Sequence, residues 1–99
     1  MGNSYRDLVV WQKSMELTKK IYTITKDFPK EEVYGLTSQI RRSAVSIPSN
    51  IAEGKGRNSD KEFVRFLQIS LGSLYELQTQ FELAVSFNYV SNIKDIFEE

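Results

Sequence analysis

The stretch SDKEFVRFLQISLGSLYELQTQFELAVSFN, residues 59–88, decides the fold, because apolar and small residues recur in it at alternating gaps of four and three. This is the spacing of a helix that buries a continuous stripe against neighbouring helices. Ser59 followed by Glu62 is a capping box, in which the serine hydroxyl accepts a hydrogen bond from one otherwise unpaired backbone N–H and the Glu62 carboxylate accepts one from another. The repeating positions are Phe63, Leu67, Ser70, Leu74, Leu77, Phe81 and Ala84.

Two upstream segments show the same helical periodicity. Residues 5–27 are predicted to form a helix whose apolar stripe runs on to Phe28. Phe28-Pro29 ends this helix because a residue preceding proline is disfavoured in the α region. Residues 31–53 carry a second stripe, and Gly54-Lys55-Gly56 predicts the end of that helix. Short connections favour antiparallel neighbours, and residues 93–99 begin a fourth helical pattern. The sequence therefore predicts a single all-α domain, residues 1–99, folded as an antiparallel up-and-down four-helix bundle with a truncated fourth helix.

Pro48 lies inside the second stripe, where it removes one backbone hydrogen bond and predicts a kink. Ser46, Ser49 and Asn50 are expected to compensate for the carbonyl that loses its partner. The surrounding polar residues predict a hydrogen-bonded network that fixes helix register, and a polar pocket or subunit contact is the alternative interpretation. This network comprises Arg42, Ser46, Pro48, Asn50 and Glu53.

The composition argues against several classes of function. Thirteen basic and thirteen acidic residues leave no net charge, so nucleic-acid binding would depend on a local patch. Histidine and cysteine are both absent, which removes the usual general base and the thiolate metal ligands. We therefore expect no enzymatic activity, no catalytic or metal site and no cofactor. No signal peptide or apolar run of membrane-spanning length is visible, so the expected location is the cytoplasm and no membrane contact is expected.

A cluster of basic residues near the second and third helices is the candidate nucleic-acid site. Arg57, Lys61 and Arg65 are spaced by four, which places them on one helical face where they could contact phosphates. Glu53, Glu62 and other acidic residues lie among them, so a salt-bridged or solvated bundle end is the alternative. The complete cluster is Arg41, Arg42, Lys55, Arg57, Lys61 and Arg65.

The stretch QIRRSAVSIPSNIAEGKGR, residues 39–57, resembles the signature of the four-helix-bundle proteins encoded in 23S rRNA intervening sequences. The resemblance extends over nearly the whole chain. It includes YRDL at residues 5–8, VWQK at 10–13 and YGL at 34–36, together with FP, EF, FL, GS and EL at 28–29, 62–63, 66–67, 72–73 and 76–77.

This resemblance implies a cytoplasmic bacterial protein whose left-handed bundle assembles with copies of itself into a ring-shaped homopentamer. The related accessory proteins of diversity-generating retroelements use such a ring to bind nucleic acid and a reverse transcriptase, whereas no biochemical activity is associated with the family itself. We therefore expect a homo-oligomeric scaffold or adaptor, and an RNA- or DNA-binding accessory protein is the alternative. Two departures stand out: the fourth helical pattern is short, and this chain is neutral where the retroelement proteins are strongly basic.

Overall fold

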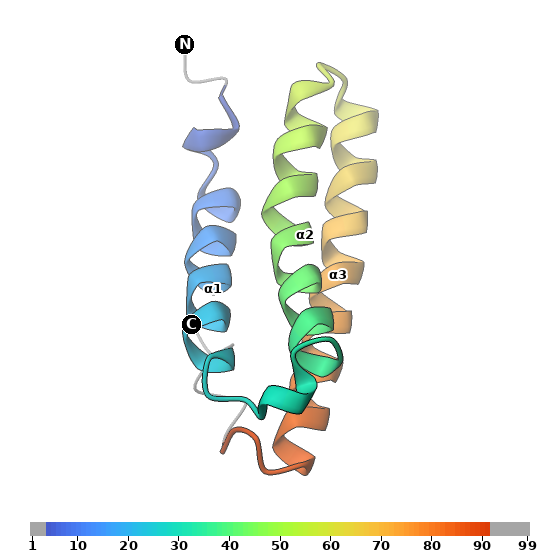
Figure 1. Ribbon diagram of the computed structural model, residues 1–99. Coiled ribbons are helices and arrows are strands. Elements are labelled where there is room, and N and C mark those ends of the chain that lie inside the picture. Colours follow the sequence, from blue (N-terminus) through green and yellow to red (C-terminus); the bar gives the residue numbers. More distant parts are fainter. Residues whose placement is uncertain (1–3, 92–99) are drawn as a thin grey trace.

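The computed structural model describes residues 4–91, in which three α-helices run up and down as antiparallel neighbours (Figure 1). No strand occurs within this part of the chain, so the predicted all-α class is confirmed. The fourth helix predicted for residues 93–99 lies outside the described residues. The elements are η1 (Tyr5–Asp7), α1 (Val9–Thr25), η2 (Lys30–Glu32), α2 (Leu36–Gly56) and α3 (Asp60–Ser86), of which η1 and η2 are single 3-10 turns.

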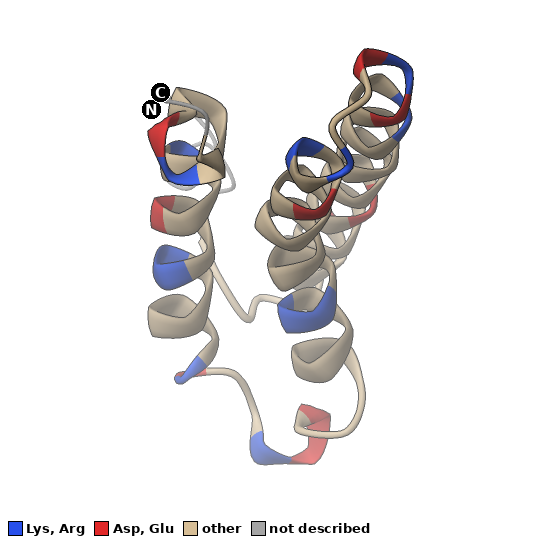
Figure 2. Ribbon diagram, turned by 90° about the horizontal axis from the view of Figure 1, so that it is seen from above, with Lys and Arg blue, Asp and Glu red and all other residues tan. Residues whose placement is uncertain are grey.

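Helix α2 lies at the centre of the arrangement and packs against α1 and α3, whereas the backbones of α1 and α3 do not approach each other closely (Figures 1 and 2). The core is built from the periodic apolar residues of all three helices. Its largest fully buried side chains are Ile21, Ile40, Ile51, Leu77 and Phe81. The periodicity therefore identified the faces that pack, since these residues all belong to the three predicted stripes.

The first two helices begin later than the sequence predicted. Leu8 has an extended backbone and separates η1 from α1, so the helix starts at Val9. Gly35 likewise separates η2 from α2, and the Glu32 carboxylate accepts a hydrogen bond from the Leu36 N–H at 2.9 Å. A side-chain acceptor at this place satisfies one of the backbone donors that a helix start leaves unpaired.

Helix α2 ends at the last residue of the predicted stop Gly54-Lys55-Gly56, three residues later than predicted, and these glycines do not make the turn. Asn58 makes the turn instead, with a φ of 57°, a left-handed conformation that asparagine tolerates better than most residues. Gly54 has a different role: a Cβ there would lie 2.6 Å from Cβ of Phe66. The glycine therefore permits α2 and α3 to approach closely.

Both ends of α3 have recognisable caps. The Ser59 hydroxyl accepts a hydrogen bond from the Glu62 N–H at 3.3 Å, which confirms the serine half of the predicted capping box. The Glu62 carboxylate accepts from Arg65 rather than from the start of the helix. At the other end Asn88 has a φ of 65°, and the Tyr89 N–H donates to the Ala84 carbonyl at 2.9 Å. This pattern is a Schellman motif. It turns the Tyr89 ring onto Phe28, with ring centroids 5.5 Å apart.

Candidate functional site

The predicted basic cluster is divided between two regions of the molecule. Arg41 and Arg42 lie in the first half of α2, whereas the other cations surround the α2–α3 turn. Lys55 follows Arg41 by fourteen residues along the same helix, which corresponds to about 21 Å. The six residues therefore do not form one continuous patch, although they are close in the sequence.

The arginines at the α2–α3 turn form ion pairs with acidic residues. Basic and acidic residues alternate in this region (Figure 2). The Arg57 guanidinium lies 2.7 Å from the Glu53 carboxylate, and that of Arg65 lies 3.0 Å from Glu62. The hydrogen bond from Arg65 lowers the pKa of the Glu62 carboxyl below its usual value. All four side chains are substantially exposed, so these pairs contribute little to stability, but they neutralise much of the local positive charge.

The same two arginines also cover an aromatic ring. Their guanidinium carbons lie 5.1 Å (Arg57) and 4.5 Å (Arg65) from the ring centroid of Phe66. The Lys55 Nζ lies 5.9 Å from the ring centroid of Phe63, and the Lys61 side chain is exposed. The α2–α3 turn is therefore a salt-bridged end of the bundle. In the sequence analysis this was the alternative to a nucleic-acid site.

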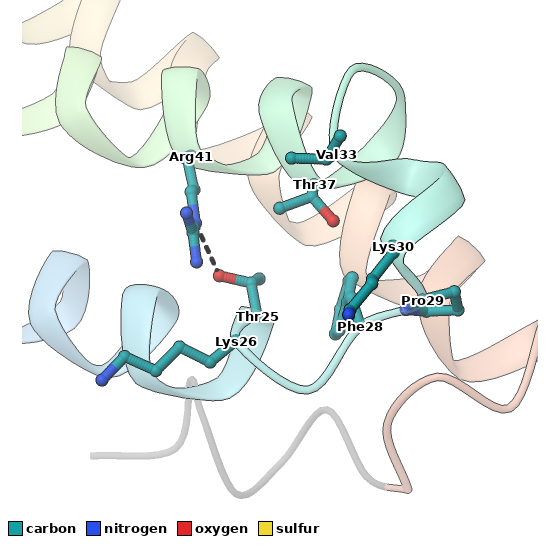
Figure 3. A pocket seen from close by; sticks show the side chains of 8 residues that line it. All are labelled: Thr25, Lys26, Phe28, Pro29, Lys30, Val33, Thr37 and Arg41. Atoms are coloured by element: carbon teal, nitrogen blue, oxygen red, sulfur yellow. Dashed lines mark hydrogen bonds between the residues drawn. The ribbon is translucent and has the colours of Figure 1, made fainter.

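Arg41 is held in a fixed position between α1 and α2. Its Nε donates to the Thr25 hydroxyl at 2.8 Å (Figure 3). Its guanidinium carbon lies 4.5 Å from the ring centroid of Tyr22. Because Thr25 and Tyr22 both belong to the end of α1, Arg41 joins the two helices. Arg42, the next residue, is exposed.

The predicted polar network is present in part and joins α2 to α3. Hydroxyl oxygens of Ser46 and Ser73 are 2.8 Å apart, and the Asn50 amide donates to the Ser46 carbonyl at 2.8 Å and to its hydroxyl at 3.0 Å. Ser70 donates to the Ile47 carbonyl at 2.9 Å. The α3 partners in this network were not predicted from the sequence, although Ser70 lies on the predicted seam. A small polar residue at a seam position is the signal for such a helix-to-helix hydrogen bond.

The other predicted members of the network lie apart from this contact. Glu53 pairs with Arg57, Arg42 is exposed, and Pro48 is buried. Helix α2 continues on both sides of Pro48, and proline at this position leaves the Ala44 carbonyl without its helical donor.

The sequence placed the compensation for Pro48 on Ser46, Ser49 and Asn50, but Thr18 of α1 provides it. The Thr18 hydroxyl lies 3.2 Å from the Ala44 carbonyl, and it also bonds to the Ser14 carbonyl at 2.8 Å. Thr18 can reach the freed carbonyl because that carbonyl faces α1, whereas the serines and Asn50 face α3 or solvent. Only the packing of α1 on α2 reveals this donor.

No group of three or more acidic side chains within residues 4–91 is placed to hold a metal ion. None of the helices in this part of the chain is long and apolar enough to cross a bilayer.

The helices of this protein run up and down and are joined by hydrogen bonds between α2 and α3. The protein therefore belongs to the class of small helical-bundle proteins. The family model for the 23S rRNA-intervening sequence protein matches residues 6–99. The chain therefore belongs to this family, as the IPSNIAEG stretch and its flanking residues indicated. No curated protein matches the sequence.

Proposed function

We propose that this chain is a non-enzymatic helical bundle that assembles with copies of itself and acts as a scaffold or adaptor. The observation that carries the proposal is an exposed apolar strip along α3, called here the α3 lateral face. Exposed fractions there are 52% for Val64, 46% for Leu71 and 60% for Tyr75. The α3 lateral face comprises the exposed side chains of Val64, Leu71 and Tyr75, bordered by the partly buried Leu67 and Leu74.

The spacing of this face is that of a helix-to-helix contact. Val64, Leu67, Leu71 and Leu74 follow one another at gaps of three, four and three, which is the repeat of a bundle seam. Leu67 and Leu74 are partly buried at the edge of the stripe that packs on the core, whereas Val64 and Leu71 are exposed beside it. The α1 backbone stays close to α2 rather than to α3. A contiguous apolar strip of this kind marks an interaction surface more often than an isolated exposed leucine does.

A second copy of the chain is the proposed occupant of the α3 lateral face. A domain of this size buries a modest share of its surface and gains stability by association. The family resemblance suggests five copies in a ring, which would use the same face repeatedly around the symmetry axis. The carboxylates of Glu53 and Glu62 are already paired with arginines, which supports a structural role over acid–base chemistry.

Light scattering across a dilution series tests this proposal. We expect the natural chain to form an oligomer that Leu71→Lys/Tyr75→Lys dissociates while its helical circular dichroism is retained. Ile69→Lys/Leu83→Lys is the matched control, because it adds the same charge at exposed apolar residues of α3 outside this face. A natural chain that stays monomeric at every concentration would contradict self-assembly, and loss of the oligomer in the control alone would contradict the choice of face.

An RNA- or DNA-binding accessory role, by resemblance to the retroelement proteins, is the second proposal. The exposed side chains of Arg42 and Lys61 support it, whereas the ion pairs of Arg57 and Arg65 weaken it. Binding of a structured RNA should then fall steeply with salt, because phosphate contacts release counterions. Arg57→Glu/Lys61→Glu should reduce both affinity and salt slope, and absence of binding at low salt would contradict this role.

A further inference from the structure

Two adjoining cavities form a continuous depression between the end of α1 and the first half of α2, called here the α1–α2 groove. Each cavity has a volume of about 400 Å³, and both are lined by Val33, Thr37 and Arg41. Figure 3 shows Thr37 and Arg41 approaching the end of α1 from the α2 side, while Phe28 and Pro29 form the connection. The remaining lining residues are Tyr22, Thr25, Lys26, Lys30, Ser38, Arg42 and Val45.

The groove has an apolar floor and exposed apolar edges. Phe28 is buried beneath it, and Val33 is 52% exposed beside Pro29. Tyr22 and Val45 line the second cavity, with exposed fractions of 40% and 41%. These side chains form an apolar surface wide enough for a bulky hydrophobic side chain of a partner.

The charged residues that line the groove are all basic: Lys26, Lys30, Arg41 and Arg42. Lys26, Lys30 and Arg42 have no carboxylate within ion-pair distance in the part of the chain that the structure describes. This differs from the α2–α3 turn, where each arginine already has an acidic partner. The groove therefore retains a positive field that its own residues do not neutralise, although the chain as a whole has no net charge.

Arg41 is pre-positioned for an incoming anion. Thr25 and the backbone carbonyl of Tyr22 accept its Nε and Nη2 protons, at 2.8 and 3.4 Å, so the guanidinium is oriented before a ligand arrives. Less side-chain entropy is lost when such a group binds a carboxylate. The guanidinium carbon also lies 4.5 Å from the ring centroid of Tyr22. Arg41 therefore covers the face of the Tyr22 ring on which a nucleic-acid base would otherwise stack.

We propose that the α1–α2 groove binds an acidic amphipathic peptide segment of a partner protein. One bulky apolar side chain would lie against Val33 and Pro29, and flanking Asp or Glu residues would contact Lys26, Lys30, Arg41 and Arg42. Charge complementarity carries the choice of an acidic partner, and the apolar floor favours a peptide over a polynucleotide. The inference does not depend on self-assembly through the α3 lateral face.

Fluorescence anisotropy with the full chain tests the proposal. The probe is a labelled peptide of about twelve residues, three helical turns, in which Glu and Asp surround two leucines and a phenylalanine at helical spacing. One control peptide replaces the acids by Gln and Asn, and a second replaces the three apolar residues by Ser. We expect saturable binding of the probe and at least about tenfold weaker binding of each control peptide.

Two protein variants locate the binding site. Lys30→Glu/Arg42→Glu should weaken probe binding by about tenfold, and Val33→Ser should weaken it without a change in charge. Lys13→Glu/Lys61→Glu is the matched control, because it changes net charge equally at exposed lysines outside the groove and should bind almost as the natural chain does. Unchanged circular dichroism in all three shows that the fold is retained.

Three outcomes would overturn the proposal. Equal loss in the groove variant and in its charge-matched control would mean that binding is only a response to net charge. Binding of a single-stranded RNA oligonucleotide, but not the acidic probe, with sensitivity to Lys30→Glu/Arg42→Glu would assign the groove to nucleic acid. Loss of the oligomer in Val33→Ser, measured by light scattering, would assign the groove to a second copy of the chain.

Discussion

Thr18 is the residue that connects the proline of α2 to the packing of α1. Pro48 cannot donate to the Ala44 carbonyl, and the Thr18 hydroxyl lies 3.2 Å from that oxygen. A hydroxyl has one proton, which Thr18 shares between Ala44 and the nearer Ser14 carbonyl at 2.8 Å. The bond across the helices is therefore partial, but it is the contact that satisfies an otherwise unpaired acceptor at a half-buried site.

Replacing Thr18 by valine, which keeps the shape and removes the hydroxyl, should lower the free energy of unfolding by about 1 kcal/mol. Thr23→Val is the matched control, because Thr23 bonds to the Lys19 carbonyl in the same local pattern at an exposed site. Urea denaturation measures both values. Pro48→Ala restores a backbone donor for Ala44, so the cost of Thr18→Val should shrink in that background, and an equal cost in both backgrounds would contradict the assignment.

Glu32 joins three parts of the chain through one carboxylate. It accepts the Leu36 N–H at the start of α2, and it accepts the Tyr89 hydroxyl at 2.8 Å from the segment after α3. The bond from the Leu36 N–H and then that from Tyr89 lower the pKa of Glu32 below its usual 4.5. The bond to Glu32 also raises the pKa of Tyr89 above its usual value, because the phenol is held in its donating, protonated form.

The lowered pKa of Glu32 predicts an acid-sensitive contribution to stability. A group whose pKa falls on folding stabilises the folded state above its unfolded pKa, near 4.5, and loses this effect as pH falls through the lower folded value. Glu32→Gln should therefore lower the melting temperature at pH 7, with a smaller difference at pH values well below 4.5. Thermal melts followed by circular dichroism measure this. Glu31→Gln is the control, and a difference that does not change with pH would contradict the role of the charge.

At the scale of helices, periodicity predicted the three packed stripes and the Ser59 cap placed the start of α3, but local signals misplaced the starts of α1 and α2 and the end of α2 by a few residues. Gly54 and Gly56 suggested a helix stop, yet a glycine required by a close helix contact has the same appearance in sequence as a glycine that ends a helix. Asn58 makes the turn. The distinction depends on Phe66, which approaches Gly54 from a different helix and therefore cannot be identified from residues near the glycine.

The candidate sites were less predictable than the helices for the same reason. Arg41 and Arg57 were grouped because they are close in the sequence, but they lie near opposite ends of the continuous helix α2. Lys26, Lys30 and Val33 were not considered as ligand contacts, because the α1–α2 groove forms only when the connection between two helices folds beside Arg41. Contacts between elements, rather than the composition of one segment, create both the α2–α3 network and this groove.

Gly54→Ala should destabilise the protein by about 1–3 kcal/mol, because its Cβ would overlap Phe66 and force α2 and α3 apart. Gly72→Ala is the matched control within α3. No atom of a neighbouring element lies within 4 Å of the place that a Cβ would take there, so alanine should raise stability by up to about 1 kcal/mol through helix propensity. Urea unfolding measures both variants, and a stabilising Gly54→Ala would show that the helix contact is loose.

The whole molecule is elongated, with principal dimensions of 44 × 20 × 19 Å, and its surfaces differ by helix. The α3 lateral face is apolar, the α2–α3 turn is charge-paired, and the α1–α2 groove is basic around an apolar floor. Because of this separation, substitutions can test the proposed assembly through α3 and the proposed partner binding through α1 and α2 independently. A scaffold or adaptor requires such independence, because a surface used for assembly is buried and no longer accessible to a partner.

Self-assembly also predicts that stability depends on concentration. When copies bury the α3 lateral face only in the folded state, each tenfold dilution removes up to about 1.4 kcal/mol per association step. The melting temperature of the natural chain should therefore fall on dilution. The melting temperature of Leu71→Lys/Tyr75→Lys should not change with concentration and should equal that of the natural chain at the lowest concentration. The melting temperature of the control Ile69→Lys/Leu83→Lys should still fall on dilution. Differential scanning calorimetry and fluorescence melts cover the range, and a constant melting temperature for the natural chain would count against assembly coupled to folding.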